Sequence, residues 1–381
     1  MTHYRLISLL LAMGVTAWAA LRVHADEPPA TLEKISFHDE KRQPHEIFGR
    51  VLIEAADGGL LVEERQGRLW TIDKPQLKAR SSTGEQYHPL TIDELARQLP
   101  QELGPGFEAI TTKHYIVCGN AGREYAEWTA LLFERLYAAF QNYWKQRGVR
   151  LREPEFPLVA IVFANQQQFA EFATRDAGPD AATAKGYYSI ASNRMVMYDL
   201  ASATGRQRGD IARKLAAAPY NVATLVHEAT HQIAFNSGLH TRYADNPLWL
   251  TEGMAMFFET PDLKNRSGWR TVGAVNPLRL RQFRDYARSR RPANSLQTLL
   301  GSDARFLDAE QMADAYAEAW TLTHFLIRTR KQEYVKYLTK VAEKSRLVWD
   351  TPEERLAEFQ AVFGDDLQKL DRDLLRYLQK L

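Results

Sequence analysis

Hydrophobic residues recur at short intervals between residues 47 and 72, and glycine-containing turns interrupt them. Asp57-Gly58-Gly59 and Gln66-Gly67 are typical of the tight turns that join antiparallel strands. The pattern therefore predicts three short strands, at Ile47–Ala56, Leu60–Arg65 and Arg68–Ile72. Three such strands in succession favour a small β-barrel or a meander.

The segments on either side of these strands are more polar. Residues 26–45 show no clear period, and we expect them to form an extended lead-in. Residues 73–105 are rich in Pro, Ser, Thr and Gln, which predicts a linker over 85–105 with one short helix, Thr91–Gln98. Residues 26–84 would then be a small, SH3-like β domain. Such a domain either packs against its neighbour or binds a partner such as a cell-wall polymer.

Beyond Gly106 the spacing of apolar residues changes between strand-like and helix-like periods. Strands are predicted at Lys113–Gly119 and Pro157–Phe163, and in a hairpin of Gly186–Ala191 with Arg194–Asp199. Helices are predicted at Glu124–Arg147, Gln166–Thr174, Asn221–Phe235, Ala313–Arg330, Glu333–Lys344 and Leu367–Leu378, and a capping box at Thr351-Pro352-Glu353-Glu354 opens another that ends near Phe363. The predicted fold class is α+β. A mixed sheet and a helical subdomain occupy residues 106–345, and the helices of residues 346–381 pack on them.

The first 25 residues have the three parts of a secretory signal peptide. Arg5 supplies a positive start, Leu6–Leu21 is apolar, and Val23-His24-Ala25 offers a cleavage site after Ala25. The alternative is an uncleaved membrane anchor, but the apolar run has 16 residues and a spanning helix prefers about 20. We therefore expect a secreted or periplasmic protein with no stable membrane insertion after cleavage.

Composition and charge narrow the function further. The chain has 381 residues, of which 45% are hydrophobic, so it can bury a large core. Without residues 1–25 it carries 47 basic and 47 acidic residues, and we expect no nucleic-acid partner. The single cysteine, Cys118, lies in an apolar run and excludes an internal disulfide. A buried strand residue is the favoured interpretation of Cys118 over a nucleophile.

The stretch His227-Glu228-Ala229-Thr230-His231 carries the clearest chemistry in the chain. Two histidines four apart on a helix project from one face and can reach one zinc ion, with the Glu228 carboxylate beside it. A catalytic zinc site needs a third protein ligand and an open position. The alternative is an amphipathic helix whose polar residues lie on a solvated face.

The third ligand is expected downstream. Ala234 and Ser237 stand where a metzincin has Gly and His, so that arrangement fails. Asp245, Glu259, His240 and Glu252 all remain available, and we favour Glu252 because Gly253 and Ala255 would allow close packing against the zinc helix. His240 or Asp245 could instead orient a ligand imidazole from the connecting loop.

Residues 106–345 resemble the gluzincin-type metallopeptidases of the peptidase MA clan. They are most similar to a family of secreted bacterial proteins known only as a domain of unknown function. The resemblance rests on the His-Glu-x-x-His stretch, on Asp245–Gly253 with its Trp-x-x-Glu-Gly-x-Ala form, and on Tyr316–Phe325. It implies a zincin-like fold and a Zn²⁺ ion held by His227, His231 and Glu252.

The resemblance also implies roles for other residues. Glu228 would act as general base, and Tyr316 would stabilise the oxyanion of a peptide bond under attack. The alternative for Tyr316 is a core aromatic, and for His324 a satisfied core histidine is preferred. Met195–Tyr198 would be the edge strand that receives the substrate backbone, or an ordinary edge strand. Thr251 replaces the Asn of many aminopeptidase relatives, which favours an endopeptidase.

Several interpretations stay open on the sequence alone. The segment Lys264–Arg291 has nine basic residues and one acid, and forms either a solvated helix face or a rim that prefers anionic substrates. The expected partner is a protein or peptide substrate. The alternatives are a secreted binding protein with a non-catalytic metal site and an amidase that acts on cell-wall peptides.

Overall fold

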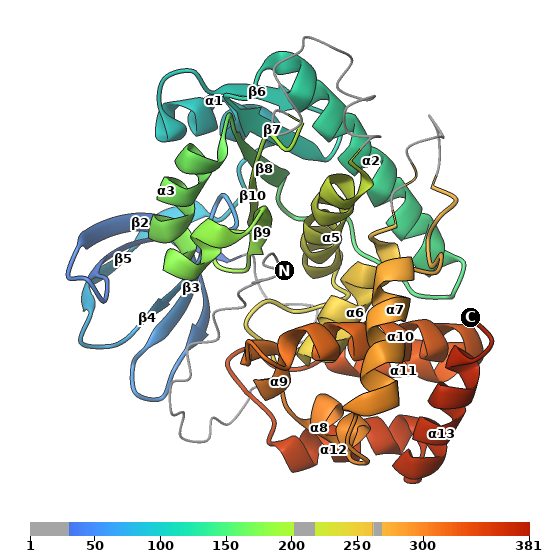
Figure 1. The fold of residues 1–381 in the computed structure, drawn as a ribbon. Coiled ribbons are helices and arrows are strands. Elements are labelled where there is room, and N and C mark those ends of the chain that lie inside the picture. Colours follow the sequence, from blue (N-terminus) through green and yellow to red (C-terminus); the bar gives the residue numbers. More distant parts are fainter. Residues whose placement is uncertain (1–29, 202–217, 261, 263–268) are drawn as a thin grey trace.

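The computed structural model describes residues 30–201, 218–260, 262 and 269–381 of the chain. The predicted signal peptide lies outside the described residues. The fold is α+β, with two five-stranded sheets in the first half and helices in the second, as Figure 1 shows. None of the helices in the described segments is long and apolar enough to cross a membrane.

The N-terminal sheet is antiparallel and has the strand order β4-β3-β2-β1-β5. Its strands are β1 (Thr31–His38), β2 (Pro44–Glu54), β3 (Leu60–Glu64), β4 (Leu69–Ile72) and β5 (Leu77–Gln86). The three predicted strands are confirmed as β2, β3 and β4. The sheet does not close into a barrel, so the meander is the correct alternative for these strands.

Two strands of this sheet were not predicted. β1 forms within the expected lead-in and buries Leu32, Ile35 and Phe37 among charged neighbours. β5 forms where the sequence suggested polar connecting chain, and nearly all of its residues are exposed. Its backbone pairs with β1, and since pairing of this kind requires no apolar side chains, hydropathy gives no sign of it.

The second sheet has the order β6-β7-β8-β10-β9. Its strands are β6 (Glu108–Thr111), β7 (Tyr115–Gly119), β8 (Leu158–Phe163), β9 (Gly186–Ser189) and β10 (Arg194–Tyr198). β7, β8 and β10 are parallel, while β6 and β9 pair antiparallel at the two edges. The expectation that Met195–Tyr198 forms an edge strand is therefore wrong, because β9 covers β10 and is itself the edge.

Alternate residues of the parallel strands enter two separate cores. Val117, Ala160 and Met197 face the helices α2 and α5, whereas Cys118 and Ile161 face α1 and α3. The helices are α1 (Ile92–Leu103), α2 (Arg123–Lys145), α3 (Gln166–Ala177) and α5 (Pro219–Asn236), with a 3-10 turn, η1, at Pro179–Thr183. Cys118 is a buried strand residue, as predicted, and burial raises the pKa of its thiol to about 12.

The second half of the chain is helical and lies below α5 in Figure 1. It comprises α6 (Leu248–Phe258), α7 (Pro277–Ser289), α8 (Ser295–Gly301), α9 (Ala304–Leu307), α10 (Met312–Thr329), α11 (Lys331–Ala342), α12 (Pro352–Phe363) and α13 (Leu367–Leu378). Gly253 of α6 lies against α10, where an added Cβ would be 2.8 Å from Ala319 O and closer still to Thr323. Gly253 thus allows close packing on α10, not on α5 as predicted.

The loop between α5 and α6 is bound to the N-terminal sheet and to the C-terminal helices. Arg242 pairs with Glu63 of β3 at 2.9 Å and donates to Gly67 O at 2.7 Å. Asp245 pairs with Arg355 of α12 and with Lys344, the latter at 3.1 Å. Asp245 therefore joins the C-terminal helices to the loop, and the prediction that it could orient a ligand imidazole is wrong.

Replacement of Arg242 by Met should destabilise the protein by about 3 kcal/mol, because it breaks a buried ion pair and leaves Glu63 and two backbone carbonyls with fewer donors. Urea denaturation measures the free energy of unfolding. Arg123→Met is the control, since its ion pair with Glu127 is exposed and should contribute little. Equal stability of the two variants would contradict a structural role for the Arg242 contact.

Candidate metal centre

Helix α5 carries the His-Glu-x-x-His stretch through the interior of the protein. Val222, Leu225 and Ile233 bury its apolar side against the sheet and α2. Its polar side is buried as well, since His227 is 3% exposed and Glu228 is 1% exposed. The alternative of a solvated polar face is therefore wrong. Buried polar groups of this kind need partners, and α6 supplies them.

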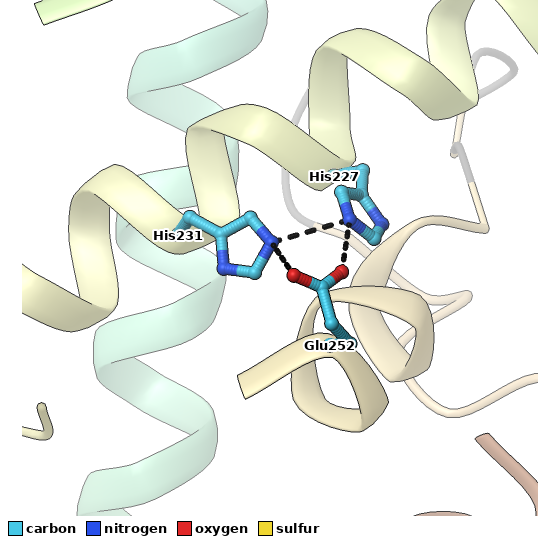
Figure 2. Close-up of side chains that lie close together, drawn as sticks. All are labelled: His227, His231 and Glu252. Carbon is cyan, nitrogen blue, oxygen red and sulfur yellow. Dashed lines mark hydrogen bonds and ion pairs between the residues drawn. The ribbon is translucent and has the colours of Figure 1, made fainter. Parts of the chain in front are cut away.

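Three side chains converge between α5 and α6. Nε2 of His227 and Nε2 of His231 lie 3.2 Å apart, and Glu252 reaches up from α6 between them, as Figure 2 shows. The Glu252 carboxylate places Oε2 3.1 Å from His227 Nε2 and Oε1 3.4 Å from His231 Nε2. The three ligand atoms lie within 4.8 Å of one another, so this group could hold a metal ion.

The donor set fits a bound cation. Two imidazole nitrogens cannot both donate toward each other, and a metal ion between them would use both lone pairs. In the metal-free protein burial opposes protonation of His227, but hydrogen bonds with Glu252 and Glu259 raise its pKa to about 10. A cation would thus replace a proton that the two carboxylates already attract.

Glu259 fixes the orientation of His227. Its Oε2 lies 3.0 Å from His227 Nδ1, so that nitrogen carries the proton and Nε2 is left for the metal. Asn276 donates to Glu259 Oε1 at 2.6 Å and holds the carboxylate in place. From the sequence, Glu259 is only a rival of Glu252 for the place of third ligand. Its spacing of 32 residues from His227 follows no local pattern, so only the fold reveals this contact.

Glu228 lies beside the three candidate ligands but is not one of them. Its Oε2 accepts a hydrogen bond from the backbone N–H of Tyr188 in β9 at 3.0 Å. Its Oε1 is buried and has no hydrogen-bond partner within the described part of the chain. Burial raises the pKa of Glu228 to about 7, although both histidines act in the opposite direction.

Tyr316 and His324, the two candidate residues of α10, are both buried. Tyr316 is buried, its ring packs against Phe306, and Arg279 lies 5.6 Å above the ring centre. Burial raises the pKa of Tyr316, and the nearby Glu252 charge raises it further. His324 is a satisfied core histidine, as predicted, since Gly273 O and Tyr377 Oη occupy its two nitrogens.

His240 is buried against the ring of Phe235, with the ring centres 5.3 Å apart. Burial lowers the pKa of His240 to about 3, so it is neutral at ordinary pH. Neither of its nitrogens forms a hydrogen bond to any residue that the structure describes. It therefore orients neither ligand imidazole, and that predicted role passes to Glu259.

A cavity opens beside the metal centre. His227, Glu228 and Glu259 are among the residues that line it. Lys185, just before β9, and Arg279, in the first turn of α7, contribute to its walls. Among the described basic residues of segment 264–291, only Arg279 lines this cavity, while Arg281, Arg284, Arg288 and Arg290 are exposed on α7 and its end.

One family model matches the chain. It is described as "Protein of unknown function (DUF1570)" and covers residues 221–348, which include the candidate metal centre, Glu259 and Tyr316. This match supports a domain of unknown function, the coarser part of the resemblance found in the sequence. A comparison with curated proteins found no match.

Replacement of Glu259 by Gln should lower the affinity for Zn²⁺ by about 10- to 100-fold, because His227 loses the charged acceptor that fixes its tautomer. Competition with a chromogenic chelator gives the dissociation constant. Glu310→Gln, an exposed residue outside the site, is the control. An affinity equal to that of the control would show that Glu259 does not support the ligand.

Proposed function

We propose that the protein is an exported zinc-dependent endopeptidase. His227, His231 and Glu252 would hold the ion, and Glu228 would act as general base. One observation carries the proposal: a buried group of two imidazoles and a carboxylate adjoins a cavity lined by Glu228, whose Oε1 has no hydrogen-bond partner among the described residues. A purely structural metal site has no need of such a carboxylate.

The donor set favours zinc among the common metal ions. Two histidine nitrogens and one carboxylate oxygen are typical of catalytic zinc, which leaves a further position open. When bound, the ion would polarise a substrate carbonyl and make water more acidic. Glu252 is buried, yet the two histidines keep its pKa well below the usual range, so it stays ionised as a ligand must.

Glu228 has the properties of a general base at neutral pH. Its pKa of about 7 lies near the operating range, and a cation on the neighbouring ligands would lower that value. The Tyr188 N–H holds Oε2 in place, which leaves Oε1 to accept a proton from water and pass it to the leaving amine. Tyr316 is the nearby candidate for the donor that stabilises the oxyanion.

Strand β9 is suited to hold an extended peptide. It is the edge of the second sheet, and the Tyr188 N–H on its outer side reaches Glu228. A peptide added to this edge would lie alongside the general base. An edge strand accepts a chain that continues in both directions, which supports an endopeptidase. This role was expected for Met195–Tyr198, and the sheet order transfers it to β9.

Replacement of Glu228 by Gln should leave Zn²⁺ bound and lower kcat/KM for peptide cleavage by about 10²- to 10⁴-fold, because the amide cannot accept the proton. Mass spectrometry of a peptide library gives the cleavage, and elemental analysis gives the metal content. Glu310→Gln should behave as wild type. Cleavage that persists in Glu228→Gln, or after removal of the metal by a chelator, would refute the proposal.

Replacement of Tyr316 by Phe should lower kcat by about 10²- to 10³-fold with little change in KM, since a hydroxyl that acts only on the oxyanion does not contribute to substrate binding. Steady-state kinetics on the best library peptide separates the two constants. Tyr337→Phe is a matched control, because Tyr337 is buried against Trp249 and Phe359 outside the site. Equal kcat values in the two variants would make Tyr316 a core aromatic.

A further inference from the structure

The cavity beside Glu228 has a cationic wall that the general-base chemistry does not use. Lys185 lies in the turn between η1 and β9 and lines the cavity. Its Nζ donates to Asn221 Oδ1 at 3.0 Å, an uncharged acceptor. Within the described ranges of the chain Lys185 forms no ion pair with a carboxylate. An ammonium group has three donors, so two remain for a ligand.

The start of α5, which lies next to Lys185, adds to the positive potential. Tyr220, Ala223 and Thr224 of the first turns of α5 line the cavity. The helix begins at Pro219 after Ala218, whose side chain cannot cap it. The positive end of the α5 dipole therefore lies at the cavity. Tyr220, which lines the cavity, is 64% exposed.

The negative groups of the cavity are already engaged. Glu259 contacts His227 and Asn276, and its Oε1 lies 3.8 Å from Arg279 Nε. In the proposed enzyme the divalent ion and its single carboxylate ligand together carry one positive charge. That charge balances the negative charge of Glu228. The charge of Lys185 is left over, so the cavity as a whole favours an anion.

We propose that this cavity is a substrate subsite for a carboxylate, with Lys185 as the residue that determines the specificity. The carboxylate belongs to an acidic side chain held close to the bond under attack; capture of the free C-terminus of a peptide instead would make the enzyme a carboxypeptidase. The inference deepens the proposed peptidase function and rests on it for the class of substrate. The preference for a carboxylate can be tested without turnover.

The test is a binding measurement on the Zn²⁺-loaded Glu228→Gln chain by calorimetry. One pair of acetylated peptide amides differs only in Glu or Gln at the central position, and a second pair differs only in a free or amidated C-terminus. We expect the carboxylate member of at least one pair to bind about tenfold more tightly. The pair that responds identifies the source of the carboxylate, and the difference should shrink with added salt.

Lys185→Met should reduce this preference to about equal binding, because methionine keeps an unbranched side chain of similar size and has no charge. Lys336→Met is the matched control, since Lys336 is exposed on α11 and does not line the cavity. Equal binding of both members of each pair to the parent chain would overturn the inference. A preference that survives in Lys185→Met would overturn it as well.

The outcome is separable from that of the proposed function. A carboxylate preference that depends on Lys185, with no cleavage by the wild-type chain, would support the subsite and refute the peptidase. Cleavage that depends on Glu228, with equal binding of the two members in both peptide pairs, would support the peptidase and refute the subsite.

Discussion

The contact of the Glu252 carboxylate with the two imidazoles of α5 is the interaction on which the rest of the site depends. A carboxylate and two histidines are all buried there, and such groups are costly to bury without one another. The contact is possible only if α6 lies close beneath α5. Gly253 contributes to that position, because the absence of a side chain lets α6 approach Ala319 and Thr323 of α10.

The loop between α5 and α6 carries this constraint to distant parts of the chain. Arg242 attaches it to the N-terminal sheet, and Asp245 attaches it to α12 and to Lys344. Both contacts lie within ten residues of Glu252. The N-terminal sheet also joins the turn between β9 and β10, where Leu69 N donates to Ala191 O at 2.8 Å. The N-terminal sheet and α12 thus hold the loop that connects the two helices of the candidate metal centre.

Local pattern was enough to predict the elements that bury an apolar face. α5 and the strands β2 to β4 follow from the spacing of their hydrophobic residues and turns, and the His-Glu-x-x-His stretch identifies two members of the metal group. Pattern failed where a contact depends on distant chain. β5 is stabilised by its pairing with β1, β10 is an interior strand because β9 covers it, and Glu259 reaches His227 across 32 residues.

The open N-terminal sheet leaves β5 with one side of its backbone unpaired in the described part of the chain. Such an edge offers a template on which a second chain can add a strand. β5 carries Lys78, Arg80 and Glu85 along an almost fully exposed surface. A second strand added here would have to remove water from these charged side chains, which is costly. The same polarity that concealed β5 from hydropathy therefore protects the protein from edge-to-edge aggregation.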